Sequence, residues 1–116
     1  MKRFWSLSRL TIEEAGERLS REFRSTDPEF DCENLYEWFE ITSPDGMRLN
    51  VSRKHVGGEP DFDEPVCISA YGGPNVNDLG RRLAVCLTST VYYGEVSYLG
   101  GDEYRFVEET RFEPNA

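Results

Sequence analysis

Carboxylates and aromatic rings alternate in two short segments, which are the parts of this sequence best suited to chemistry. The first segment reads DPEFDCEN and the second reads GGEPDFDEP. Aromatic rings bury large areas at an interface, while carboxylates steer a basic partner and accept paired hydrogen bonds from arginine. We therefore expect a protein-binding surface made of these segments and the rings beside them: Asp27, Glu29, Phe30, Asp31, Glu33, Tyr36, Trp38, Glu59, Asp61, Phe62, Asp63 and Glu64.

The sequence favours binding over catalysis. His55 is the only histidine, so a cysteine–histidine pair with a second, orienting histidine cannot be assembled. Cys67 and Cys86 fall in apolar segments and are typical of small core residues, while the carboxylates around Cys32 disfavour a reactive thiolate. A general acid needs a desolvated carboxyl group, and the acids here fall in predicted loops and outer strand faces. We expect a protein that is not an enzyme and needs no cofactor.

Metal and phosphate sites are also disfavoured by spacing. The run DFDE at residues 61–64 lacks the glycine and the distant glutamate of a calcium-binding EF-hand loop. The paired glycines at 72–73 and 100–101 lack the following lysine of a phosphate-binding loop and are typical of turns. We expect no dedicated metal site, with weak adventitious calcium binding as the alternative.

Net charge narrows the class of partner. The chain has thirteen basic and twenty-two acidic residues, a net charge of -9. Residues 1–25 hold six of these bases and four of these acids, which leaves seven bases and eighteen acids, a net charge of -11, for the rest. Such a chain repels nucleic-acid phosphates and anionic lipid headgroups. We therefore expect neither nucleic acid nor membrane as a direct partner.

The cysteines and the first residues indicate the compartment. Three cysteines without a CxxC pair do not form a secreted disulfide framework. Polar residues, among them Ser6, Ser8 and Arg9, interrupt the apolar residues near the start, which excludes a signal-peptide core. No apolar run approaches the roughly 20 residues that span a bilayer. These features predict a cytoplasmic protein.

Hydrophobic periodicity predicts the elements that position the acidic segments. Thr11 and Glu14 form a capping box, and apolar residues at helical spacing follow it, so we predict a helix over residues 11–24. Asn75 caps a second helix that ends near Ser89. Alternating residues predict strands, which form a hairpin over 35–54, a strand over 66–71, a hairpin over 91–112 and a short strand within 3–8.

These elements define the predicted fold. At 116 residues and 13.4 kDa, the chain has the length of a single domain over residues 1–116. The order of elements predicts an α+β fold, with an antiparallel or mixed sheet of about five or six strands and two helices packed on one face. Both acidic segments are expected to be exposed loops.

The sequence resembles the small acidic immunity proteins that bacteria encode beside polymorphic or contact-dependent toxins. The features that carry the resemblance are the size, the α+β order, the segments DPEFDCE and EPDFDEP, and the stretch VYYGEVSYLGGDEYRFVEE. The resemblance implies a protein that binds a cognate toxin domain, often a basic nuclease, and neutralises it. It leaves open the identity of the toxin, whether inhibition blocks the active site, and whether the acidic segments or a sheet face form the interface.

An acidic secretion chaperone is the alternative class. Such chaperones bind an extended segment of an effector protein, and they are dimers with an exposed apolar groove.

The oligomeric state separates the two classes. We expect light scattering of the purified protein to give a monomer mass near 13.4 kDa, because an inhibitor of this kind acts as a single copy. A stable homodimer would favour the chaperone instead.

Overall fold

The computed structural model describes residues 1–33, 35–56, 58–101 and 103–115. In this part of the chain, eight strands and two helices follow one another in the order β1 (Lys2–Ser6), α1 (Ile12–Phe23), β2 (Glu29–Cys32), β3 (Tyr36–Thr42), β4 (Arg48–Val56), β5 (Glu59–Pro60), β6 (Val66–Tyr71), α2 (Val76–Leu87), β7 (Val91–Gly100) and β8 (Glu103–Phe112).

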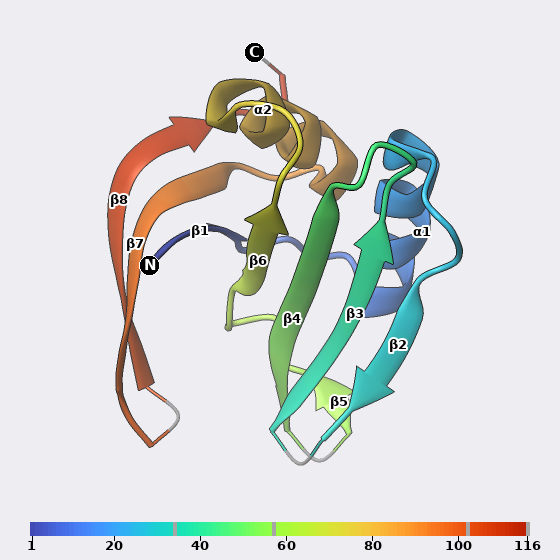
Figure 1. Ribbon diagram of the computed structural model, residues 1–116. Helices are drawn as coiled ribbons and strands as arrows, with labels where there is room; N and C mark the ends of the chain where they lie inside the picture. The colour runs from blue at the N-terminus through green and yellow to red at the C-terminus, as the bar shows by residue number, and fades with distance from the viewer. Residues whose placement is uncertain (34, 57, 102, 116) are drawn as a thin grey trace.

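Seven strands form a path across an open sheet, in the order β2-β3-β4-β6-β1-β7-β8, and β5 pairs with the end of β4. All of the pairings between described strands are antiparallel. The predicted α+β class with an antiparallel sheet is confirmed, but the sheet has eight strands rather than five or six. Figure 1 shows the β7–β8 hairpin curving away from the other strands.

The two additional strands, β2 and β5, lie in the acidic segments that were expected to be loops. The sequence analysis was wrong here because acidic residues are depleted in strands generally, and local composition therefore argued against strands. Partner strands supply the pairing: Phe30 lies opposite Phe39, and Val56 lies opposite Glu59. β2 is an edge strand, where charged side chains are common because they discourage pairing with other molecules.

Both predicted helices form where their capping residues indicated. The hydroxyl of Thr11 accepts a hydrogen bond from the backbone N–H of Glu14, whose carboxylate accepts one from the N–H of Thr11. The side chain of Asn75 accepts from the N–H of Asp78. Each helix has twelve residues. No helix within the described residues combines the length and the apolar composition needed to cross a membrane.

A single core lies between the two helices and one face of the sheet. α1 packs against β3, α2 packs against β7 and β8, and the helices contact each other. The strand registers place one transverse row of side chains on this face: Phe30, Phe39, Val51, Ile68, Phe4 and Tyr93. Leu19 and Leu83 are fully buried against the sheet. The opposite face of the sheet has no helix over it (Figure 1).

Gly80 lets α2 approach the last strand closely, because a Cβ atom at this position would overlap the ring of Phe112. Gly80→Ala should lower the free energy of unfolding by up to about 2 kcal/mol, since the overpacking cost of about 1–3 kcal/mol is offset by a helix-propensity gain of about 1 kcal/mol. Urea denaturation followed by circular dichroism measures this change.

The exposed Asn77→Ala substitution in the same helix is the control and should change stability by less than about 0.5 kcal/mol. A smaller loss for Gly80→Ala in a Phe112→Leu background would locate the strain at this contact. A stabilising Gly80→Ala would contradict the close approach.

Candidate functional site

The sheet face opposite the helices, called here the helix-free face, is unusually aromatic. The strand registers place a continuous row of side chains across it: Asp31, Trp38, Ser52, Cys67, Trp5, Tyr92 and Arg111. The solvent side of an antiparallel sheet normally alternates polar residues with the core. Trp5 is buried among its neighbours on this face, whereas Trp38 and Tyr92 are partly exposed.

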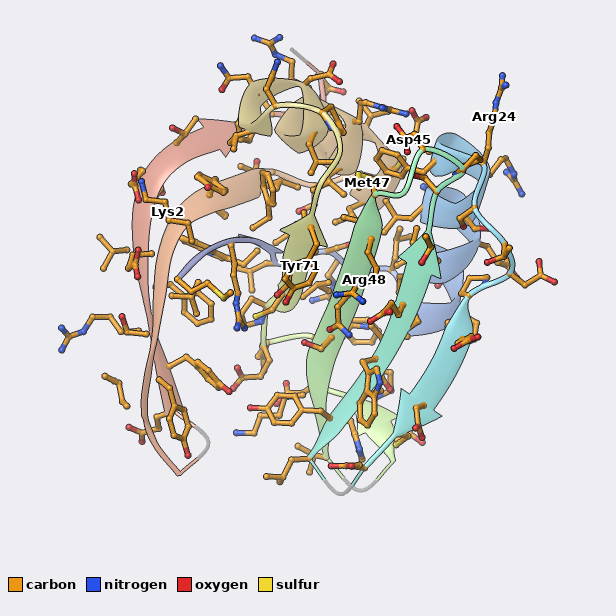
Figure 2. The ribbon with its side chains drawn as sticks, viewed as in Figure 1. Lys2, Arg24, Asp45, Met47, Arg48 and Tyr71 are labelled. Carbon is orange, nitrogen blue, oxygen red and sulfur yellow. The ribbon has the colours of Figure 1, made fainter. Side chains whose placement is uncertain are left out.

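Rings on this face pack against one another and against arginines. Trp5 stacks on Tyr92 with ring centroids 6.0 Å apart and lies 5.1 Å from Phe106. Farther along the sheet, the guanidinium of Arg48 lies 5.0 Å from the centroid of the Tyr71 ring, and both side chains are visible side by side in Figure 2. Tyr71 is nonetheless 42% exposed. The face is thus preformed and still accessible to a partner.

Carboxylates border the aromatic row at the β2 edge of the sheet. Glu29 and Asp31 are exposed and point to the helix-free face, as the register with Glu40 and Trp38 requires. Glu40 lies 3.9 Å from Arg48, a separation between half-exposed groups that contributes little to stability. Exposed carboxylates of this kind are free to attract a cationic partner.

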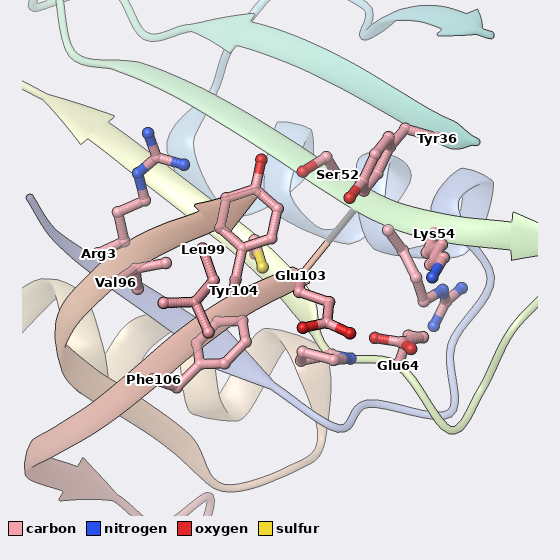
Figure 3. A pocket seen from close by; sticks show the side chains of 13 residues that line it. Arg3, Tyr36, Ser52, Lys54, Glu64, Val96, Leu99, Glu103, Tyr104 and Phe106 are labelled. Carbon is pink, nitrogen blue, oxygen red and sulfur yellow. The ribbon is translucent and has the colours of Figure 1, made fainter. Parts of the chain in front are cut away.

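A cavity of about 410 Å³ opens on the helix-free face. It lies between the β7–β8 hairpin and strands β3 and β4, and we call it the hairpin cavity (Figure 3). Its lining consists of Arg3, Tyr36, Ser52, Arg53, Lys54, Glu64, Pro65, Cys67, Val96, Leu99, Glu103, Tyr104 and Phe106. The volume is in the range of small-molecule sites.

Cys67 lines the hairpin cavity, and its environment makes its thiol unreactive. Burial raises the pKa of its thiol to about 11, because the charged thiolate is poorly solvated there. Only a small fraction is ionised at neutral pH, and the thiolate is the reactive form. The Cys67 thiol is therefore a poor nucleophile at neutral pH.

The structure gathers part of the predicted binding set on the helix-free face. Glu29, Asp31, Tyr36 and Trp38 share this face by strand register, and Glu64 lines the hairpin cavity. Phe30 points the other way, toward α1, where its ring packs 5.5 Å from that of Phe39. The remaining members lie outside this grouping, in turns or in and near β5: Asp27, Glu33, Glu59, Asp61, Phe62 and Asp63.

Phe62 packs within the molecule, because two arginines lie over its ring. The guanidinium of Arg53 is 4.7 Å from the ring centroid and that of Arg9 is 5.4 Å away. Cation–π contacts of this type are worth about 0.5–2 kcal/mol. The second acidic segment is therefore fastened to the sheet by the ring that the sequence analysis assigned to a partner.

Arg53 is buried on the helix side of β4, with 1% of its surface exposed. Its guanidinium donates to the carbonyl of Ser8 at 3.2 Å and to that of Leu10 at 2.8 Å. The Oε1 atom of Glu37 lies 3.8 Å from Nη2 of Arg53, so the two side chains form an ion pair without a hydrogen bond. Burial lowers the pKa of Arg53 and raises the pKa of Glu37. The pair joins β3 and β4 to the segment before α1.

The structure also brings Cys32 and His55 together, which the sequence analysis missed. The Cys32 Sγ lies 3.3 Å from the His55 Nε2. Nδ1 of His55 accepts from the backbone N–H of Gly58, which assigns the ring proton to Nε2, and this nitrogen donates to the carbonyl of Glu33. A protonated Nε2 cannot take a proton from the thiol, so the pair is structural. The inward position of His55 in β4 was the signal for it.

Comparison with known proteins gives no family for this chain. No protein-family model matches the chain, and no solved structure matches it. A segment of 46 residues is 41% identical to a "Probable dipeptidyl peptidase 4" from Emericella nidulans. The matched segment is 39% of this chain and 6% of that protein. The chain thus spans a small part of the length of this relative, and the similarity assigns neither a fold nor an activity.

The buried arginine gives a direct test of this arrangement. Arg53→Met should lower the free energy of unfolding by about 3–5 kcal/mol, because it leaves the Glu37 carboxylate buried without its counter-charge. It also removes both hydrogen bonds to the backbone carbonyls. Urea denaturation of the variant measures the loss.

Arg105→Met is the matched control, because Arg105 is exposed on β8 and should tolerate the change to within about 0.5 kcal/mol. Equal stability of the two variants would show that Arg53 does not hold these segments together.

Proposed function

We propose that this protein is an inhibitor of the immunity type, which binds and neutralises a basic toxin domain, such as a nuclease, through the helix-free face of its sheet. The observation that supports this proposal is the aromatic row on that face, bordered by the exposed carboxylates of β2 and next to the hairpin cavity. Exposed apolar groups gathered on one face mark interaction surfaces in soluble proteins.

Rings and carboxylates have different tasks in the proposed complex. Trp38 and Tyr71 supply area that is buried on binding, and buried aromatic residues dominate the energy of many interfaces. Glu29 and Asp31 border them and attract a basic domain over distances of about 10 Å at moderate salt. The net charge of -9 adds to this attraction. Fast association followed by slow release is what an inhibitor needs against a toxin inside the same cell.

A secretion chaperone is the second candidate, and the open edge of β8 is the observation that favours it. This ten-residue strand lies at the end of the sheet, so one of its sides has no partner strand among those described. An extended segment of another protein can add to such an edge through backbone hydrogen bonds. The exposed side chains of Tyr104 and Val107 would then contact that segment.

The inhibitor proposal predicts that a neighbouring reading frame encodes a basic toxin domain, and this domain is the partner used in the test. Co-expression of the two should restore the growth that the basic domain abolishes, and the two products should purify as a complex. Trp38→Ala should raise the Kd of that complex by about 30-fold or more, the effect of losing an anchor worth about 2 kcal/mol. Asp31→Lys should raise it by about 10-fold at low salt, and by less at high salt.

Glu17→Lys is the charge-matched control, because Glu17 is exposed on α1, on the other side of the sheet. It should change the Kd by less than about threefold if the interface is the helix-free face. Equal effects of Asp31→Lys and Glu17→Lys would place the interface elsewhere. Absence of both binding and growth rescue would contradict the inhibitor function itself.

A further inference from the structure

The hairpin cavity has charges of opposite sign at its two ends. Figure 3 shows Arg3 at one end of the lining side chains and Glu64 and Glu103 together at the other, with the Tyr104 ring between them. Cys67 also lines the cavity, and the charges of Arg3 and Glu64 both act on its thiol. A ligand that fills the cavity therefore meets a cation at one end and carboxylates at the other.

Arg3 lacks the acceptors that a half-buried guanidinium requires. Its Nε is buried and has no hydrogen-bond partner, and its Nη2 has the Sδ of Met1 at 3.4 Å, a weak acceptor. No ion pair joins Arg3 to another described residue. Leaving a buried charged donor unsatisfied costs more than about 1–3 kcal/mol. Because Nε is shielded from solvent, an anionic group of a ligand would bind at the Nη donors.

The opposite end of the hairpin cavity has two carboxylates, those of Glu64 and Glu103. Glu64 and Glu103 form no ion pair with any other described residue. Lys54 and Arg53 also line the cavity, and the Arg53 charge faces Glu37. Glu64 and Glu103 together carry one more charge than Lys54. No group of three or more metal-binding side chains occurs among the described residues. An organic cation fits this pair of carboxylates better than a metal ion does.

The walls between the two ends select the shape of the ligand. Tyr36, Tyr104 and Phe106 contribute rings, and Val96 and Leu99 contribute aliphatic groups. A short apolar stem packs against such walls, and a planar cation can stack on a ring while two carboxylates accept its hydrogen bonds. A guanidinium meets these conditions better than an ammonium, because its donors form a rigid planar fork.

We infer that the hairpin cavity binds a small zwitterion of the arginine type, with its guanidinium at Glu64 and Glu103 and its carboxylate at Arg3. The binding site is complete within one chain, so this inference goes beyond the proposed toxin inhibition and does not require a protein partner. The ligand is bound without chemical change, and the Cys67 thiol in the lining stays protonated at neutral pH because burial raises its pKa to about 11.

Three probes of graded charge test the inference on the isolated protein. Nα-acetylarginine carries both charged ends, its amide lacks the carboxylate, and Nα-acetylnorvaline lacks the guanidinium. Titration of ¹⁵N-labelled protein, followed by amide chemical shifts, should give saturable binding of Nα-acetylarginine with a Kd of about 1 mM or below. Each of the other two probes should bind about 10-fold more weakly, the effect of losing one charged hydrogen bond of about 1.5 kcal/mol.

Two variants locate the ends of the bound probe. Arg3→Met should weaken Nα-acetylarginine about 10-fold and leave the amide unaffected, whereas Glu103→Gln should weaken both guanidinium probes and spare Nα-acetylnorvaline. Glu17→Gln on α1 is the control and should change nothing. Glu103 is exposed in the hairpin, so its substitution tests the site even if Arg3→Met fails to fold. No saturable binding, equal Kd values for the three probes, or insensitivity to Glu103→Gln would overturn the inference.

Discussion

The buried guanidinium of Arg53 is the interaction on which the arrangement of this molecule depends. It is hydrogen-bonded to the carbonyls of Ser8 and Leu10, lies over Phe62 and faces Glu37. Four segments that are distant in the sequence thus meet at one side chain. Removing a charge from water at this position is unfavourable, and the two hydrogen bonds, the ion pair and the ring contact offset this desolvation free energy only together. The second acidic segment is held to the sheet in this way.

One-sided coverage of the sheet follows from the same packing. Both helices and the segment around Phe62 lie on the helix side, so the apolar residues of the helices are buried on that side. The other face has to be stabilised by contacts among its own side chains, and ring pairs such as Trp5 with Tyr92 and Phe106 provide them. A face built from rings is rigid, and a rigid surface loses little conformational entropy when a partner binds.

Local signals in the sequence were sufficient for the helices and hairpins. Thr11 and Asn75 mark helix starts through hydrogen bonds to residues three positions away, and strand alternation has a period of two wherever a strand has one buried face. The contacts of Phe62 with Arg9 and Arg53 could not be predicted, because the fold brings these arginines to it. β2 was missed for a similar reason: its four residues pair with β3, and their acidic composition says nothing about that pairing.

The site was predictable to a smaller degree than the fold. Tyr36 and Trp38 alternate with the buried Phe39, so their shared face could be inferred, but which face the helices would cover could not. Arg53 and His55 continue the inward alternation of Leu49 and Val51 and are both buried, which this parity could have indicated. The hairpin cavity depends on where the β7–β8 hairpin lies relative to β3 and β4, a property of the whole sheet that no short segment encodes.

The position of β1 has a consequence for how the chain reaches this structure. β1 precedes the other described strands in the chain, yet it lies inside the sheet between β6 and β7, and it pairs with residues 66–68 and 91–95. Contacts across such separations form late, because closing a long loop lowers the chain's entropy before any stabilising contact has formed. Until β7 has left the ribosome, one edge of β1 has no partner strand to pair with. The sheet is therefore completed in a single late step, once nearly the whole chain is present.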